Sequence, residues 1–408
     1  YALFRTKADE AYPLNPDKGP VDAYLDIPTI IRIAKEKKVD AIHPGYGFLS
    51  ENPEFAEACR KNDIVFIGPN VEAMNIMGDK ISAKRAAEES KVPIIDGSDF
   101  IIHDVDTAMK IADEIGYPVM LKASNGGGGR GMRIVQSQEE MEEAFESKRV
   151  FGEAKLFIEK YLIHPKHIEV QILGDNYGNI VHLYDRDCSL QRRNQKVIEF
   201  APAWSISEET RKKILDSAKR LARRVGYTNA GTMEFLVDEE EQPYFIEMNP
   251  RIQVEHTVTE MVTGIDIVIC QILIAEGYPL NSPTIHIYSQ NEIKCTGYAL
   301  QARVTTEDPA NHFLPDTGKI DLYRSGSGGG IRLDGGTAYT GAVITPHYDS
   351  LLVKVLSHAR TFENAIHKSV RALKELRIHG VKTNITFLIN VLNHETFHKG
   401  KCFTTFIE

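Results

Sequence analysis

The chain has 408 residues, too many for one ordinary hydrophobic core, so two or three domains are expected; 42% hydrophobic and 26% charged residues are typical of a soluble globular protein. The formal net charge of -9 argues against a general nucleic-acid binder, and no apolar run approaches the length of a membrane span. The five cysteines are scattered without a Cys-x-x-Cys pair, which suggests neither a disulfide framework nor a zinc site and fits a reducing compartment. Because the chain begins at Tyr1 instead of Met and stops abruptly at Glu408, we expect a piece of a longer protein.

Residues 1–92 are predicted to form an N-terminal α/β domain. Short apolar runs at 39–42 and 64–67 indicate buried strands, and a helical segment lies between them. A polar helix is expected over 71–91, before Pro93. Alternation of helices and strands in this way predicts a parallel sheet.

Residues 93–161 are predicted to form a small domain around a glycine-rich hairpin. The stretch YPVMLKASNGGGGRGMRIV, residues 117–135, places four consecutive glycines and then Arg130-Gly131 between two apolar runs. Helical stretches at 105–115 and 138–146 flank it, and the strand KLFIEKYL follows. Glycine at this density is costly to order unless the backbone must bend freely or approach a ligand closely.

The glycines fit the spacing G-x-G-x-x-G, but their context does not fit a dinucleotide fold. A second strand follows them where that fold needs a helix, and the Gly-Lys-Ser/Thr of a P-loop is missing. What remains is a hairpin whose backbone N–H groups form an anion-binding nest, helped by the charge of Lys122. We therefore predict a lid over a polyphosphate, with a flexible surface hairpin as the alternative.

Residues 162–408 are predicted to form a large domain with an antiparallel sheet. Many short strands are separated by turns, among them HIEVQILGD, IVHLYDRD, TMEFLVD, YFIEMN and YALQARVT. Helices expected at 208–225 and 266–274 would pack on this sheet.

One hairpin in this domain predicts a metal site. In GTMEFLVDEEEQPYFIEMN a polar turn separates two apolar strands, and a turn centred between residues 240 and 241 sets Glu234 opposite Glu247. Alternation then puts Glu247 and Asn249 on one face. Two carboxylates and an amide on one face suit Mg²⁺, which takes one or two carboxylates plus substrate phosphates. The alternative is that these acids face water.

The next residues, PRIQVEH, predict an anion site with a base. If the extended pattern continues past Pro250, Arg251, Gln253 and Glu255 share one side. Arginine fits carboxylate-like anions bidentately, and glutamate is a plausible general base, although a surface ion pair would look the same. In the basic run QRRNQK, Lys196 is the residue expected to point inward.

Together these segments resemble the biotin carboxylase component of biotin-dependent carboxylases, which has an ATP-grasp fold. The resemblance covers essentially the whole chain and is carried by AIHPGYGFLSEN, MGDK, KASNGGGGRGMRIV, FIEKYL, HIEVQILGD, RDCSLQRRNQK, FIEMNPRIQVEH, TEMVTGIDIV and GVKTN. FRTKADEAYPL and ELRIHGVKTN look most like the N-terminal domain of pyruvate carboxylases. The implied fold is mixed α/β: a parallel N-terminal domain, a glycine-rich lid domain and a large antiparallel C-terminal domain.

The resemblance also implies a role for each matching residue. ATP would be bound by Lys80, Lys122, Gly128, Gly129, Glu159, Lys160, Leu162, His167, Gln191 and Asn194. Glu234, Glu247 and Asn249 would bind Mg²⁺ or Mn²⁺. Bicarbonate would be held by Lys196, Arg251, Gln253 and Val254, with Glu255 as the base and Arg332 stabilising the biotin enolate.

The activity implied is carboxylation of biotin through carboxyphosphate, with ATP, bicarbonate and a divalent metal. Expected partners are a biotin carboxyl carrier domain, a carboxyltransferase domain of the same full-length chain, and further copies in a homo-oligomer (a dimeric biotin carboxylase contact, or a tetramer if it is a pyruvate carboxylase), with no nucleic acid and no membrane. The location would be cytoplasmic in a bacterium and the mitochondrial matrix in a eukaryote. Alternatives are the biotin carboxylase of an acetyl-CoA or propionyl-CoA carboxylase, a carbamoyl-phosphate-forming ligase domain, and a non-catalytic nucleotide-binding domain.

The sequence departs from the family pattern at three places. A strand–helix unit that the family has does not stand before Tyr1 in the given sequence, and the stretch 147–156 is about five residues shorter than usual; real deletions and sequence left out of this chain are both open as explanations. The usual histidine of QRRHQK is Asn194, which puts one nucleotide or phosphate contact in doubt.

Overall fold

The computed structural model describes residues 3–123, 132–150 and 156–407. Its N-terminal part holds a small parallel sheet, in which β1 (Ala41–Ile42) pairs with β2 (Val65–Phe66). The predicted parallel α/β arrangement is confirmed, although both strands are shorter than the apolar runs. The helices of this part are α1 (Leu3–Lys7), η1 (Asp22–Leu25), α2 (Ile27–Glu36), α3 (Pro53–Lys61), α4 (Val71–Gly78) and α5 (Lys80–Glu89). The single helix expected over 71–91 is therefore two helices, broken at Asp79, whose side chain caps α5.

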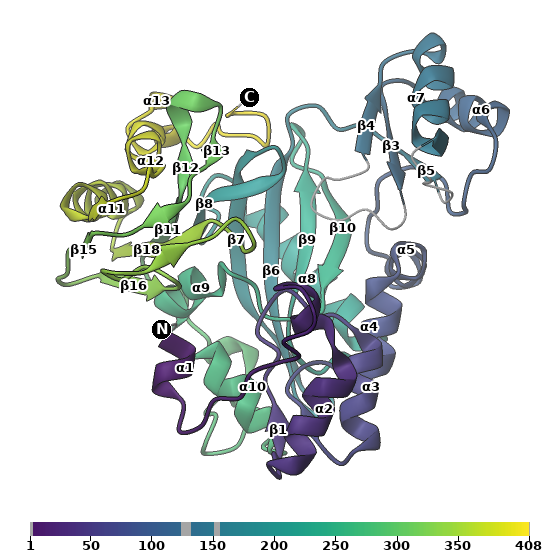
Figure 1. The fold of residues 1–408 in the computed structure, drawn as a ribbon. Coiled ribbons are helices and arrows are strands. Elements are labelled where there is room, and N and C mark those ends of the chain that lie inside the picture. The colour runs from purple at the N-terminus through teal and green to yellow at the C-terminus, as the bar shows by residue number, and fades with distance from the viewer. Residues whose placement is uncertain (1–2, 124–131, 151–155, 408) are drawn as a thin grey trace.

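The strands on either side of the glycine-rich segment belong to a separate three-stranded sheet, at the upper right of Figure 1. Strand β3 (Val119–Ala123) pairs with both β4 (Met132–Val135) and β5 (Leu156–Lys160). The helices α6 (Val105–Ile115) and α7 (Gln138–Val150) share one apolar core with these strands. The two strands of the predicted hairpin are confirmed, while its glycine tip lies outside the described residues.

The largest element is an eight-stranded antiparallel sheet in the order β10-β9-β6-β7-β8-β11-β18-β16. Its strands are β6 (Lys166–Gly174), β7 (Ile180–Arg192), β8 (Gln195–Ala201), β9 (Asn229–Val237), β10 (Pro243–Asn249), β11 (Tyr298–Thr305), β16 (Ile331–Gly335) and β18 (Leu351–Ala359). The antiparallel sheet predicted for this region is confirmed.

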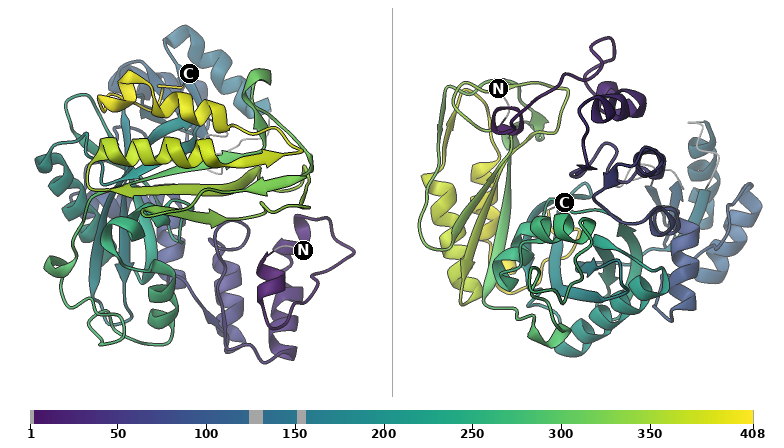
Figure 2. Two further views of the ribbon diagram at one scale, coloured as in Figure 1. Left: turned by 90° about the vertical axis from the view of Figure 1, so that its left-hand side faces the viewer. Right: turned by 90° about the horizontal axis from the view of Figure 1, so that it is seen from below.

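Helices cover this sheet and bury its apolar side chains. Helix α8 (Glu208–Arg224) packs on β6 and β7; it starts with the cap Ser207 and acids in its first turn and ends with arginines in its last, as the helix dipole favours. Helix α11 (Phe362–Glu375) lies on β18 and β11 and contacts α12 (Ile385–Leu392), as the left view of Figure 2 shows. Helices α9 (His256–Thr263) and α10 (Ile267–Ala275) follow β10 in the chain.

The remaining elements are short. They are η2 (Gln290–Glu292), η3 (Pro309–Asn311), β12 (Glu307–Asp308), β13 (Leu314–Pro315), β14 (Gly318–Lys319), β15 (Leu322–Arg324), β17 (Val343–Ile344), β19 (Arg377–His379) and α13 (Glu395–His398).

In the part of the chain that the structure describes, no single helix is long and apolar enough to cross a membrane. Only α9 and α10 taken together, with a 96° bend between them, reach the necessary length and composition.

Candidate active site

Three glutamates lie side by side across the large sheet. Glu169 on β6 is the register partner of Glu234 on β9, and Glu234 is the partner of Glu247 on β10. Like charges directly opposite across strands destabilise a sheet unless they are compensated. The predicted pairing of Glu234 with Glu247 is confirmed, and it depends on a β-bulge between Phe245 and Glu247. The sequence did not reveal Glu169, because its place depends on the non-local pairing of β6 with β9.

Lys196 on β8 compensates much of this negative charge. Its ammonium pairs with Glu169 and lies 3.0 Å from Glu234 Oε1 and 2.7 Å from Glu255 Oε1. Burial lowers the pKa of Lys196, but the surrounding carboxylates raise it by more, so the pKa stands well above the ordinary value. The prediction that Lys196 points inward is confirmed.

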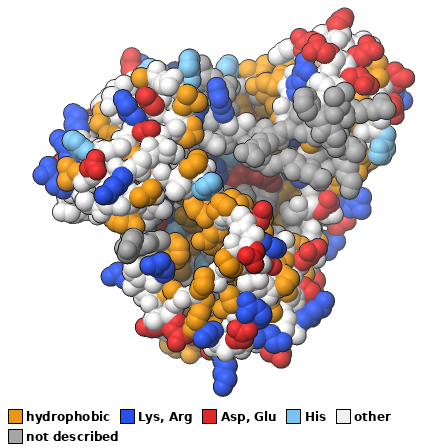
Figure 3. All heavy atoms as spheres, in the orientation of Figure 1, with side chains coloured by type: hydrophobic (Ala, Val, Ile, Leu, Met, Phe, Trp, Pro, Cys, Tyr) orange, Lys and Arg blue, Asp and Glu red, His pale blue; other side chains and the backbone are white. Residues whose placement is uncertain are grey.

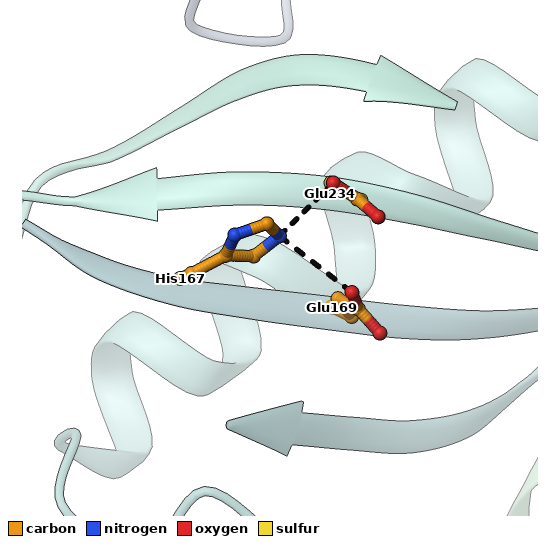
Figure 4. A group of neighbouring side chains, drawn as sticks. All are labelled: His167, Glu169 and Glu234. Atoms are coloured by element: carbon orange, nitrogen blue, oxygen red, sulfur yellow. Dashed lines mark ion pairs between the residues drawn. The ribbon is translucent and has the colours of Figure 1, made fainter. Parts of the chain in front are cut away.

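His167 joins the same group, as Figure 4 shows. Its Nε2 lies 3.0 Å from Glu234 Oε2 and 3.6 Å from Glu169 Oε1, while Gln191 Nε2 lies 2.7 Å from its Nδ1. Burial lowers the pKa of His167, but the carboxylate of Glu234 raises it by more. His167 and Gln191 therefore lie beside the carboxylates proposed for the metal.

The carboxylates of Glu234 and Glu247 have the chemistry of a divalent-cation site. Asn249 Nδ2 donates to Glu234 Oε1 over 2.8 Å, so all three predicted ligands lie together. Burial and then Glu234 raise the pKa of Glu247, and the charge of Lys80 lowers it by less. An oxygen-rich, partly uncompensated pair of this kind fits Mg²⁺ or Mn²⁺. Figure 3 shows acidic side chains in the hollow at the centre of this face.

The segment after β10 is not a strand, so the extended pattern expected past Pro250 is wrong. β10 ends at Asn249, and the chain bends and turns directly into α9, whose N-cap is Glu255. Gln253 and Glu255 nevertheless contact the cluster of glutamates around Lys196. Gln253 Nε2 donates to Glu234 Oε1 over 2.9 Å, and Glu255 pairs with Lys196. Arg251 lies at its edge: Nη2 donates to Asn249 Oδ1 over 3.0 Å, and Nε lies 3.0 Å from Glu51 Oε2.

Two arginines that the sequence analysis missed, one fully buried and one half-buried, hold these residues in place. Arg186 is fully buried and donates from Nη2 to Gln253 Oε1 over 2.8 Å, which leaves the amide nitrogen of Gln253 aimed at Glu234. Arg303 Nη2 lies 2.9 Å from Glu255 Oε2. Burial raises the pKa of Glu255, but Lys196 and Arg303 lower it by more, so the carboxylate is held ionised. Arg186 stands in a short motif, RDC, too generic to interpret without the fold.

The lysines predicted to bind phosphate lie near α5 and β3. Lys122 and Lys84 both pair with the buried carboxylate of Glu159, and burial lowers the pKa of Lys80. A cavity of about 70 Å³ beside them is lined by Lys80, Lys84 and the ring of Phe157. Lys84 was missed by the sequence analysis.

Strand β5 carries or adjoins the other residues predicted to bind the nucleotide. Glu159 and Lys160 end the strand, and Leu162 follows it, half-buried. Lys160 Nζ donates to the carbonyls of Gly116 and Tyr117, over 2.7 and 3.2 Å. The side chains of Glu159 and Lys160 therefore both make contacts within the protein.

Asn194 lies in the turn between β7 and β8. Arg192 pairs with Gln195, so Arg193 and Asn194 alone form the turn, with φ of +50° and +62°. These angles are those of a type I′ turn, in which asparagine is favoured. Local backbone geometry thus gives a structural reason for asparagine at this position.

Arg332 lies on β16. Its guanidinium Nη1 lies 2.7 Å from Glu260 Oε2, and the arginine side chain is 37% exposed. It is not part of the carboxylate group around Lys196.

Three family models match the chain in succession. Residues 1–74 match the biotin carboxylase N-terminal domain, 79–283 the ATP-binding domain of the carbamoyl-phosphate synthase L chain, and 301–408 the biotin carboxylase C-terminal domain. Among curated proteins, the pyruvate carboxylase of Bacillus subtilis (strain 168) is 56% identical over 99% of this chain, and the mitochondrial pyruvate carboxylase of Homo sapiens is 52% identical over 100%. The chain spans about a third of the length of these relatives, 36% and 35%.

Solved structures show the same fold. The biotin carboxylase domain dimer of the 2-oxoglutarate carboxylase of Hydrogenobacter thermophilus, in complex with MgADP, ADP and bicarbonate, matches with a TM-score of 0.94 at 45% identity, covering 100% of this chain and 89% of that one. The biotin carboxylase of Campylobacter jejuni in an ATP-analogue complex matches with a TM-score of 0.94 at 44% identity, covering 100% and 90%. The predicted ATP-grasp architecture is confirmed, and the chain belongs to the biotin carboxylase family.

Proposed function

We propose that this chain carboxylates biotin on a carrier domain, using ATP and bicarbonate, as the first half-reaction of a pyruvate carboxylase. The observation that carries the proposal is the position of Lys196, which contacts both the carboxylate Glu234 and the base Glu255. Such a group can hold a triphosphate-bound metal and a small anion next to each other. The Hydrogenobacter thermophilus relative, crystallised with MgADP and bicarbonate, supports the assignment of these ligands.

In the first step, bicarbonate would be held by Arg251, Gln253, Lys196 and the backbone at Val254. One bicarbonate oxygen attacks the γ-phosphorus of ATP, the bond to ADP breaks, and the bicarbonate proton passes to Glu255. Glu255 is ionised in the resting site, as a proton acceptor must be. When bicarbonate draws the Lys196 ammonium toward itself, the pKa of Glu255 rises and the carboxylate becomes a stronger base.

A metal ion and lysines would share the neutralisation of the triphosphate charge. Glu234, Glu247 and Asn249 would hold Mg²⁺ or Mn²⁺, which supplies Lewis-acid neutralisation of phosphate charge. Lys80 and Lys122, together with the backbone of Gly128 and Gly129, would neutralise the remaining charge. Catalysis of phosphoryl transfer is mostly such positioning and charge compensation. His167, Gln191 and Asn194 would complete the nucleotide site, and the backbone of Glu159, Lys160 and Leu162 would meet the adenine edge.

In the second step, carboxyphosphate splits into carbon dioxide and phosphate. The proton on biotin N1′ would pass to the phosphate just released, and the resulting enolate would attack carbon dioxide to form carboxybiotin. The guanidinium of Arg332 would compensate the enolate charge. Closing the site against water protects carboxyphosphate from hydrolysis, which is the role proposed for the glycine hairpin.

The wider assembly is part of the same proposal. The chain would act with a biotin carboxyl carrier domain and a carboxyltransferase domain of a longer protein, as a homo-oligomer; relatives include a domain dimer and a complete multifunctional pyruvate carboxylase. Its relatives come from bacteria and from mitochondria, so the location would be the cytoplasm or the mitochondrial matrix accordingly. We keep 1–92, 93–161 and 162–408 as the proposed domains, supported by the separate core of the glycine-hairpin unit.

The decisive experiment measures ATP cleavage with and without bicarbonate and free biotin. A biotin carboxylase requires bicarbonate and yields carboxybiotin, while a carbamoyl-phosphate-forming domain would cleave ATP with bicarbonate and show no use of biotin. Absence of both activities in a protein that binds ATP would support a non-catalytic domain. Carboxylation of pyruvate by the full-length protein, compared with acetyl-CoA and propionyl-CoA, then decides the final acceptor.

A further inference from the structure

Glu159 on β5 holds two lysines, one on each oxygen of its carboxylate. Lys84 of α5 pairs with Oε1, and Lys122 of β3 pairs with Oε2. Glu159 is 5% exposed, and a carboxylate buried to this degree needs a cation at ion-pair distance. One lysine would be enough for that purpose. The second lysine therefore leaves positive charge in excess beside Glu159.

The two lysines come from different parts of the fold. Lys122 lies near the end of β3, the strand that leads into the glycine-rich segment. Lys84 lies on α5, below the three-stranded sheet in Figure 1, and its ammonium is 5.7 Å from the centre of the Phe157 ring. The side chain of Lys84 is 12% exposed and that of Lys122 is 19% exposed. Lys84 is therefore the more enclosed of the two partners of Glu159.

Backbone contacts hold β5 against the segment that follows α5. The N–H of Ser98 donates to the carbonyl of Ile158 over 2.8 Å. A Cβ at Gly97 would come within 2.3 Å of the same carbonyl oxygen, so this close approach requires glycine. Glu159 is thus kept beside α5. Because each lysine uses its own oxygen, the pair with Lys84 can persist when the other lysine moves.

We infer that Lys84 is a positioning residue for ATP, because by neutralising Glu159 it leaves the charge of Lys122 available to the triphosphate. The inference rests on the phosphate-binding role proposed above for Lys122. A lysine whose charge is cancelled by a carboxylate attracts phosphate weakly, and a buried carboxylate that loses its only cation costs free energy. Without Lys84, ATP could draw Lys122 away from Glu159 only at that cost. With Lys84 in place, Glu159 keeps a cation while Lys122 turns to the phosphates.

The test measures the binding of a non-hydrolysable ATP analogue with Mg²⁺ to the full-length protein, by calorimetric titration. Lys84→Met should raise the Kd of the analogue about tenfold, because Glu159 then retains Lys122. Lys84→Arg keeps a cation next to Glu159, so its Kd should stay within about twofold of that of the unaltered protein. Lys212→Met is the matched control: it removes an exposed lysine that pairs with Asp216 on α8 and should leave the Kd unchanged.

A double variant separates this role from a direct contact between Lys84 and phosphate. In Glu159→Gln the neutral amide no longer competes for Lys122, so adding Lys84→Met to it should raise the Kd by less than about twofold. This comparison also holds if Lys84→Met does not fold on its own, because Glu159→Gln removes the charge that Lys84 compensates.

Two results would overturn the inference. One is an unchanged Kd in Lys84→Met, and the other is a rise that is as large in the Glu159→Gln background as in the unaltered protein, which a direct contact with phosphate would give. If the unaltered protein does not bind the ATP analogue at all, the proposed function fails instead.

Discussion

Glu234 on β9 lies directly opposite Glu247 on β10, and burial together with the charge of Glu234 raises the pKa of Glu247. Glu247→Gln should therefore reduce turnover by about a hundredfold or more, because it removes charge that would hold the metal against the triphosphate. Initial rates over a Mg²⁺ titration check this. Glu240→Gln, in the exposed turn of the same hairpin, is the control and should change little. Near-normal turnover of Glu247→Gln at saturating Mg²⁺ would remove Glu247 from the metal site.

Mutations at Arg332 and Glu255 should affect the two steps of the reaction differently. Arg332→Ala should abolish biotin carboxylation and leave some bicarbonate-dependent ATP cleavage, because Arg332 is not in contact with the group around Lys196. Glu255→Gln should damage both activities, since Glu255 lies 2.7 Å from Lys196 in that group. Parallel assays of ADP and carboxybiotin distinguish the two variants, and equal loss of both activities in each would contradict the division of roles.

The glycine hairpin should control the binding of ATP. Replacing both Gly128 and Gly129 by alanine should raise the KM for ATP, because Cβ atoms block positive φ angles and close approach of the backbone. Steady-state kinetics with varied ATP measure this. Unchanged kinetics would make the segment an ordinary surface hairpin.

Asn194→His tests whether the departure from the family pattern weakens catalysis. Histidine can carry charge near phosphates, and a hydrogen bond to a charged group contributes roughly 1.5–3 kcal/mol, so kcat/KM for ATP should rise about ten- to a hundredfold. Asparagine and histidine both tolerate the positive φ found here, so the turn should survive the change. Kinetics at saturating bicarbonate and biotin decide; a variant no faster than the unaltered protein would show that Asn194 is no defect.

The ion pairs of Glu159 should make the free energy of unfolding depend on pH. Burial raises its pKa, but Lys122 and Lys84 lower it by more, to about 2 from the ordinary 4.5. Because the pKa of Glu159 is depressed in the folded state, its ionised carboxylate adds to the free energy of unfolding. This contribution is complete above the pKa that Glu159 has in the unfolded chain, and it is lost as the pH falls toward 2. At neutral pH it amounts to on the order of 3 kcal/mol.

The measurement compares the free energy of unfolding of the unaltered protein with that of Glu159→Gln. The difference between them should be largest above pH 5 and shrink as the pH falls to 3. Parallel curves over that range would mean that the two lysines do not depress the pKa of Glu159.

Patterns of neighbouring residues predicted the hairpins, but they did not predict contacts between segments far apart in the chain. The Glu234–Glu247 pairing was predicted from one turn and two alternating strands; in the structure the residues next to the turn pair one residue out of that register, and the β-bulge between Phe245 and Glu247 restores it. Glu169, Arg186 and Arg303 join the site only through strands and helices far apart in the chain, which no local pattern reports. The extended pattern past Pro250 failed because alternating residues also occur in a bend that leads into a helix.

The other site residues were predicted from the resemblance to the biotin carboxylase family. Lys196, Gln253 and Glu255 lie in contact with the carboxylate group as that resemblance implied, although their roles remain predictions. The contacts of Arg332 with Glu260 and of Lys354 with the backbone carbonyl of Val254 could not be predicted, because each joins segments far apart in the chain.

The eight-stranded sheet passes without interruption through the gap between the second and third family matches. β8 pairs with β11, and the apolar side chains of both strands share one core with β18, α11 and α12. The two matched regions are therefore not interchangeable modules. A cut between residues 283 and 301 would strip a neighbour from each of two central strands and leave their backbone groups open to pairing with other chains. Chimaeras between carboxylases should accordingly be joined outside this sheet, with both regions taken from one parent.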